Sequence, residues 1–179
     1  MKDSRRKMDS GRRVAVVGMG IRSPVGNSLT EFAESLKKGR SGIRKMPEWG
    51  GIRRLRTKVA GVCNIDGEEK GIPRNFRRSM GRVSVLAALS AIDAVRQSGL
   101  GEEEIACAEC GISYGSTAGS TLEQVELIGR YILNSDLSGA QASSYLKCMS
   151  HTCSANLSTL FCLQGPLIAS CTACVSATH

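Results

Sequence analysis

Short apolar runs separated by amphipathic stretches set the pattern of this chain. Val14 to Gly18 is a run of β-branched and small apolar residues that ends at a glycine, which predicts a buried strand. Cys110 to Tyr114 has the same character and predicts a second interior strand that ends at Gly115. A third, short interior strand is expected where the apolar run from Leu167 follows the turn at Gly165.

Amphipathic stretches between these runs predict helices. Ser28 and Glu31 form a capping box, so we expect a helix that begins here and ends at Gly39. Apolar residues at helical spacing predict three more helices, over residues 80–97, 121–133 and 152–163. The segment 39–72 is rich in glycine and charge and predicts only one short strand, around Val59.

The order of these elements predicts the fold class. One face of the 80–97 helix carries small and apolar residues that suit close packing against a sheet: Val83, Leu86, Ala87, Ser90, Ala91, Ala94 and Val95. Strands that alternate with helices are typical of an α/β protein with a mainly parallel sheet covered on both faces.

Composition limits the class of protein further. With 179 residues, 41% hydrophobic and 22% charged, the chain suits one domain, which we place at residues 13–179. Residues 1–12 are basic without an apolar pattern and predict a disordered tail. No segment is long enough for a signal peptide or a bilayer span, so no membrane partner is expected. Eight cysteines without a secretory signal indicate free thiols and a cytoplasmic location.

Positive charge is concentrated in the first half of the chain. Residues 1–82 contain 21 Lys and Arg against 8 Asp and Glu, whereas residues 83–179 contain 3 against 8. The basic residues are not interleaved with stacking aromatics and no nucleic-acid motif occurs, so no nucleic-acid partner is expected. The basic half therefore faces some acidic partner or is simply solvated.

Gly18-Met19-Gly20 after a strand is reminiscent of a dinucleotide-binding loop. The third glycine of that motif is replaced by Ser23, Pro24 follows, and no helix is expected to begin before Ser28. A tight turn explains the two glycines better, and no cofactor is expected.

Cys107 and Cys110 have the spacing of half a zinc site or of a redox pair. A structural zinc site needs a second pair at similar spacing, and Cys148 with Cys153 does not supply it. Free thiols beside a strand, with no metal, are the expectation.

Cys174 is the candidate nucleophile, because it lies between the last predicted strand and a helix expected from Val175. The N–H groups and dipole at a helix start favour the thiolate and lower the pKa of a cysteine. The alternative from the residues alone is that Cys174 is a small buried hydrophobe.

Four segments, taken in order, resemble the N-terminal half of the elongating β-ketoacyl-acyl carrier protein synthases. They are RVAVVGMGIRSPVGN at residues 13–27, GRSGI at 39–43, GISYGS at 111–116 and GPLIASCTACVSATH at 165–179. The family's nucleophile lies in a Thr-Ala-Cys or Ser-Ala-Cys sequence, which Thr172-Ala173-Cys174 matches. The resemblance implies that Cys174 is catalytic and that the fold is half of a thiolase-like α/β/α/β/α sandwich.

The resemblance also implies further site residues. Ala118 and Gly119 would line the acyl pocket. A basic cluster of Arg74, Arg77 and Arg78 would dock acyl carrier protein, although such a cluster is equally explained as a solvated helix start. His151 lies where relatives have no catalytic histidine, so a role at a loop or helix start is expected. For His179 the expectation is packing or hydrogen bonding.

The activity implied is Claisen condensation of an acyl-Cys174 thioester with malonyl-acyl carrier protein in fatty-acid elongation. Relatives take the two histidines of the decarboxylation step from their C-terminal half and work as homodimers, so this chain alone is expected to be inactive for condensation. The alternative is a catalytically incomplete fragment, or half of a split protein, that acts only as an assembly partner.

Overall fold

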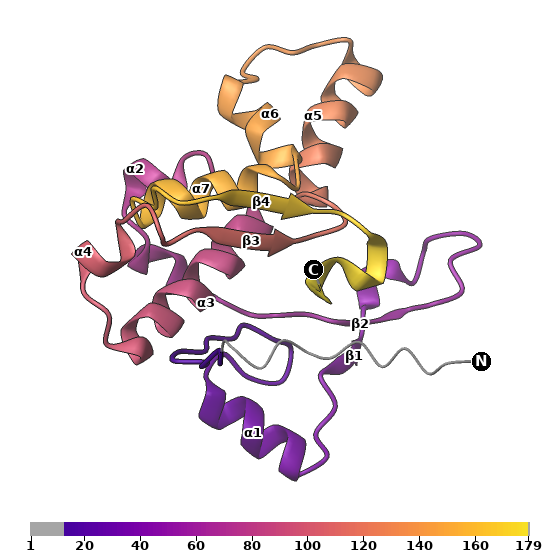
Figure 1. The fold of residues 1–179 in the computed structure, drawn as a ribbon. Coiled ribbons are helices and arrows are strands. Elements are labelled where there is room, and N and C mark those ends of the chain that lie inside the picture. Colours follow the sequence, from indigo (N-terminus) through magenta and orange to yellow (C-terminus); the bar gives the residue numbers. More distant parts are fainter. Residues whose placement is uncertain (1–12, 179) are drawn as a thin grey trace, which may run out of the picture.

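The structure, a computed structural model, describes residues 13–178 (Figure 1). The tail expected at residues 1–12 and His179 lie outside the described residues. In chain order the elements are α1 (Leu29–Lys37), β1 (Ile43–Lys45), η1 (Pro47–Trp49), β2 (Val59–Gly61), η2 (Glu68–Gly71), α2 (Arg74–Arg77), α3 (Arg82–Ser98), α4 (Glu102–Ile105), β3 (Ile112–Gly115), α5 (Thr121–Asn134), α6 (Ala142–Cys148), α7 (Thr152–Leu160), β4 (Leu167–Ser170) and η3 (Ala173–Thr178), where η marks a 3-10 helix.

Two small sheets organise the described residues. β3 and β4 pair in parallel, with Ile112 opposite Leu167 and Gly115 opposite Ser170, which confirms parallel pairing of the predicted strands. β1 and β2 form a separate antiparallel pair, of which the sequence predicted only the second strand. β4 is largely exposed rather than interior, because within residues 13–178 only β3 pairs with it.

The core lies around α7, which packs against α3 and against β3 and β4 (Figure 1). Its buried members are Ile65, Ile72, Met80, Val85, Ala88, Leu89, Cys153 and Leu157. The predicted α3 face is partly buried, and Leu86, Ala87 and Ala91 pack against the core. The most buried α3 positions lie beside that face: Ser84, Val85, Ala88 and Leu89. A helix with small residues on most sides does not specify its buried face by pattern alone.

The strand predicted at Val14–Gly18 is absent from the described structure. Val14 is 94% exposed and Val16 78% exposed, and no neighbouring strand pairs with this segment within residues 13–178. A strand requires a hydrogen-bonded partner, which an apolar run does not supply. The segment instead packs along α3. A Cβ added to Gly18 would lie 2.0 Å from the Ala94 carbonyl oxygen, so only glycine permits this close approach.

Arg22 anchors the same segment through a buried ion-pair network. Its side chain is 7% exposed, and its Nη1 lies 2.6 Å from Asp93 Oδ2 on α3. Its Nε lies 2.8 Å from Glu68 Oε2 on η2. Nη1–H also donates to the carbonyl oxygens of Ile21 and Asn27. One guanidinium thus joins three parts of the chain.

Several helix boundaries agree with the sequence signals. The Ser28 hydroxyl accepts a hydrogen bond from Glu31 N–H at the start of α1, and Gly39 follows this helix with φ +61°. Gly99 ends α3 with φ +70°. α7 ends at Leu160, three residues earlier than predicted.

α5 and α6 form a pair that projects from one end of the molecule (Figure 1). The helical spacing of α5 is confirmed, but its apolar side chains are exposed: Leu122, Val125, Ile128, Ile132 and Leu133. Such an apolar face indicates contact with further protein surface. No helix among residues 13–178 has the length and apolar character to cross a membrane.

Candidate active site around Cys174

The carboxyl ends of β3 and β4 bring two loops together. Parallel strands end at the same edge of a sheet, so residues 116–120 after β3 lie beside residues 171–173 after β4. Ser116 N–H donates to the Ser170 carbonyl at 3.1 Å and extends the pairing beyond the strands. The Cys171 thiol contacts the Thr117 carbonyl at 3.4 Å. The predicted pocket loop and the predicted nucleophile loop are therefore neighbours.

Cys174 is presented at a sharp turn. The chain leaves β4 and enters η3 at Ala173, whose φ of +50° lies in the left-handed region that an alanine adopts at a cost of about 1–2 kcal/mol. Cys174 follows directly and is exposed within residues 13–178, where the alternative expected a buried hydrophobe; its catalytic role stays a prediction. The helix was predicted to begin at Val175 but begins two residues earlier, at Ala173. Its described part is a 3-10 helix rather than an α-helix.

Three hydroxyl groups hold this turn in place. Ser176 is 5% exposed, and its Oγ–H donates to the Ala173 carbonyl at 2.6 Å while its Oγ accepts from Thr172 N–H at 3.0 Å. The Thr117 hydroxyl donates to the same Ala173 carbonyl at 3.0 Å. Ser170 Oγ–H donates to the Ser176 carbonyl at 3.2 Å. These contacts stabilise the left-handed residue that aims Cys174 outward.

The sequence did not indicate that Ser176 and Thr117 hold the turn before Cys174. Ser176 follows Cys174 by two positions, and the only local signal was its hydroxyl beside the candidate cysteine. Thr117 lies 56 positions before Ala173, so only the strand pairing brings the two together.

The two predicted acyl-pocket residues lie on the loop after β3. Gly119 is buried, and a Cβ there would lie 1.9 Å from the Cys148 carbonyl oxygen, which explains why this position is glycine. Ala118 is exposed, and its carbonyl accepts from the Ser116 hydroxyl at 3.0 Å. The pocket role of both residues stays a prediction.

The three predicted docking arginines lie on or beside α2. Arg74 and Arg78 are exposed. Arg77 is partly buried, and its Nη1–H donates to the Glu69 carbonyl at 2.8 Å, so this guanidinium also holds η2 in place. No hydrogen bond or ion pair among residues 13–178 joins the cluster to Cys174. Their docking role stays a prediction.

Tyr114 connects the core to the loop after β3. Burial, followed by a hydrogen bond to the Cys153 side chain, raises the pKa of Tyr114, and an interaction with Ser116 partly opposes this. Burial likewise raises the pKa of the Cys153 thiol. Both groups therefore stay protonated near neutral pH, and their hydrogen bond joins β3 to α7.

Other polar residues do not gather at the site. His151 is exposed before α7, as expected for a residue at a helix start. All eight cysteines are free, and residues 13–178 contain no cluster of three or more side chains arranged to bind a metal ion.

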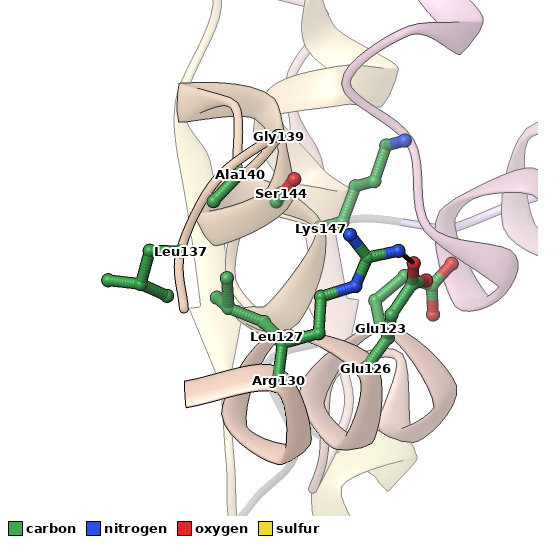
Figure 2. Close-up of a pocket in the computed structure, with 9 residues that line it drawn as sticks. All are labelled: Glu123, Glu126, Leu127, Arg130, Leu137, Gly139, Ala140, Ser144 and Lys147. Atoms are coloured by element: carbon green, nitrogen blue, oxygen red, sulfur yellow. Dashed lines mark hydrogen bonds and ion pairs between the residues drawn. The ribbon is translucent and has the colours of Figure 1, made fainter. Parts of the chain in front are cut away.

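A separate cavity of about 180 Å³ lies between α5 and α6 (Figure 2). Its charged residues are Glu123, Glu126, Arg130 and Lys147, and Arg130 Nη2 lies 2.8 Å from Glu126 Oε1. The two acidic and two basic side chains leave the cavity without a net charge. None of its lining residues belongs to the loops around Cys174.

Known proteins are similar to this chain in sequence and in fold. Residues 11–179 match the family described as "Beta-ketoacyl synthase, N-terminal domain". A 3-oxoacyl-[acyl-carrier-protein] synthase 1 of Haemophilus influenzae is 30% identical over 168 residues, and nodulation protein E of Rhizobium meliloti is 31% identical over 178 residues. Both matches cover 94% of this chain but 41% of the relative.

A solved structure agrees with these matches. The crystal structure of a beta-ketoacyl synthase from Burkholderia phymatum superposes with a TM-score of 0.83 at 32% identity, covering 93% of this chain and 41% of that one. The α/β fold of the thiolase-like type is thereby confirmed. This chain spans about two-fifths of the length of these relatives and belongs to the β-ketoacyl synthase family, as its N-terminal domain.

Proposed function

We propose that Cys174 accepts an acyl group from an acyl carrier protein thioester. The Cys174 thiolate attacks the thioester carbonyl, the bond from that carbon to the carrier sulfur breaks, and the carrier thiolate leaves and takes up a proton. An acyl-Cys174 thioester results, with no change in oxidation state.

The observation that carries this proposal is the exposed Cys174 at a strained turn braced by Thr117 and Ser176. A left-handed non-glycine residue held by two hydroxyl groups indicates that the direction of the next side chain matters. The 3-oxoacyl-[acyl-carrier-protein] synthase of Haemophilus influenzae, matched over 94% of this chain, supports the same substrate class.

The second half of the reaction needs groups that residues 13–178 do not supply. Condensation requires decarboxylation of a malonyl thioester and attack of the resulting carbanion on the acyl-Cys174 carbonyl. The one histidine among the described residues, His151, is not hydrogen-bonded to the Cys174 turn. Condensation in fatty-acid elongation is therefore proposed for the domain together with a histidine-bearing C-terminal part.

Transfer of label tests the acylation step. The 179-residue chain is incubated with acyl carrier protein carrying a radiolabelled acyl thioester, and bound label is located by peptide mapping. We expect label on the peptide that contains Cys174 and none in Cys174→Ser. Cys171→Ser is the matched control, because it removes another exposed thiol three residues away and should label normally. Equal labelling of wild type and Cys174→Ser would reject the proposal.

A second candidate function is that of an assembly partner without catalysis of its own. The exposed apolar side chains of α5, with Val14 and Ile168 elsewhere, favour it because such surfaces are normally covered. Light scattering of the chain alone and with a separately expressed C-terminal part tests this candidate and the expected homodimer together. A monomer that stays unchanged on addition of the C-terminal part would contradict both.

A further inference from the structure

The antiparallel pair β1–β2 and its connection, residues 43–61, form a hairpin that we call the basic hairpin. Its base is fixed, because Gly42 and Gly61 lie so close to Pro24 that a Cβ on either would be within 3.0 Å of it. The connection projects from the edge of the molecule opposite α4 (Figure 1). All three β1 residues are exposed, as are two of the three in β2.

Positive charge covers this hairpin. It carries six cations and a single carboxylate, and all six cations are exposed: Arg44, Lys45, Arg53, Arg54, Arg56 and Lys58. Lys58 donates to the Gly50 carbonyl at 2.7 Å, and none of the ion pairs within residues 13–178 involves any of the six. The backbone of Arg54, between Arg53 and Leu55, adopts the left-handed region with a φ of +63°.

Exposed apolar side chains are interleaved with these cations. Ile43 is 59% exposed, Ile52 50% and Val59 43%. Trp49 and Leu55 are partly exposed on the same connection. Binding of a single-stranded nucleic acid typically uses several stacking aromatics, and the hairpin has one, Trp49. Aliphatic groups between cations that have no ion pair within residues 13–178 instead match the boundary between lipid headgroups and acyl chains.

We propose that the basic hairpin binds the surface of an anionic lipid bilayer. The cations would lie among the phosphate headgroups while Ile52 and Trp49 enter the interface. The expectation of no membrane partner rested on the absence of a segment long enough to cross a bilayer, and a hairpin that lies on the surface needs no such segment. This inference does not depend on the proposed acyl transfer.

Trp49 reports on binding directly, because it is the only tryptophan of the chain. The 179-residue chain is mixed with vesicles of phosphatidylglycerol and phosphatidylcholine at 0.1 M NaCl, and sedimentation and Trp49 emission are measured. We expect the chain to co-sediment with these vesicles and the Trp49 emission to shift to the blue. With vesicles of pure phosphatidylcholine we expect neither change. Both should be lost at 1 M NaCl, where screening acts within about 3 Å.

Two charge-matched variants separate the hairpin from overall charge. The triple variant Arg53→Gln, Arg54→Gln, Arg56→Gln should bind about 100-fold more weakly, since each cation near an anionic surface contributes about fivefold. The control removes three exposed cations outside the hairpin and outside the docking cluster, with Lys37→Gln, Lys70→Gln and Arg96→Gln, and should bind within about threefold of wild type. Circular dichroism verifies that both are folded.

Each other outcome overturns the inference. Equal weakening in the two triple variants would show attraction by net charge alone, and binding to neutral vesicles would show simple apolar adsorption. Binding of a single-stranded RNA homopolymer without any binding to vesicles would assign the hairpin to nucleic acid. Label transfer to Cys174 is scored separately, so failure of one proposal leaves the other distinguishable.

Discussion

Replacing Arg22 with methionine tests whether its ion-pair network holds the N-terminal segment on the domain. Methionine keeps much of the length of the side chain but removes the charge that faces Glu68 and Asp93. Removing one partner of a fully buried ion pair costs about 3–5 kcal/mol, because the other charge is left without compensation. The two carboxylate side chains are 34% and 31% exposed, so they regain part of their hydration, and we expect a loss of about 2–3 kcal/mol.

Urea unfolding followed by far-ultraviolet circular dichroism measures this loss as a lower midpoint at constant slope. Arg96→Met is the matched control, since Arg96 also pairs with Asp93, at 3.2 Å, but is 75% exposed and should cost under about 1 kcal/mol. Adding Glu68→Gln and Asp93→Asn to Arg22→Met should recover part of the stability. An Arg22→Met loss no larger than that of Arg96→Met would refute the reasoning.

Three further predictions concern the site and its support. Ser176→Ala should speed hydrogen exchange at the Thr172 amide by about tenfold, because that N–H loses its acceptor at 3.0 Å; unchanged exchange would contradict the bracing role. Gly119→Ala should lower the free energy of unfolding by about 2 kcal/mol, because the new Cβ meets the Cys148 carbonyl; thermal melting measures this, and an unchanged midpoint would count against the close contact. Burial raises the pKa of Tyr114, so this tyrosine ionises at lower pH in the unfolded chain than in the folded one, and the free energy of unfolding should fall as the pH rises above about 10. Urea titrations from pH 8 to 11 should show a smaller fall with pH in Tyr114→Phe than in wild type. An equal fall in the two proteins would exclude this contribution.

Local sequence signals predicted those elements whose cause is local. The Ser28 hydroxyl caps the start of α1, Gly39 follows its end, and Gly99 ends α3, as their residue types indicate. Elements that depend on a partner were not predictable in this way. Val14–Gly18 has strand composition but no neighbouring strand among the described residues, and β1 has no apolar pattern yet pairs with β2.

The candidate site shows the same division. Cys174 was found because its residue type and neighbours match a known family over a short stretch. Its surroundings were not found, because Thr117 reaches Ala173 only through the pairing of β3 with β4. The burial of Ser176 likewise depends on the positive φ of Ala173, which no sequence motif indicates.

The pairing of β3 with β4 also sets an order of events during synthesis. The turns of α1 and the pairing of β1 with β2 are short-range and can form as the chain emerges. β3 has to wait with an open edge until Leu167 to Ser170 leave the ribosome, and the hydrogen bond from Thr117 to Ala173 closes a loop of 56 positions. The residues that hold the Cys174 turn thus meet only after β4 has emerged, and until then the unpaired β3 edge is open to mispairing.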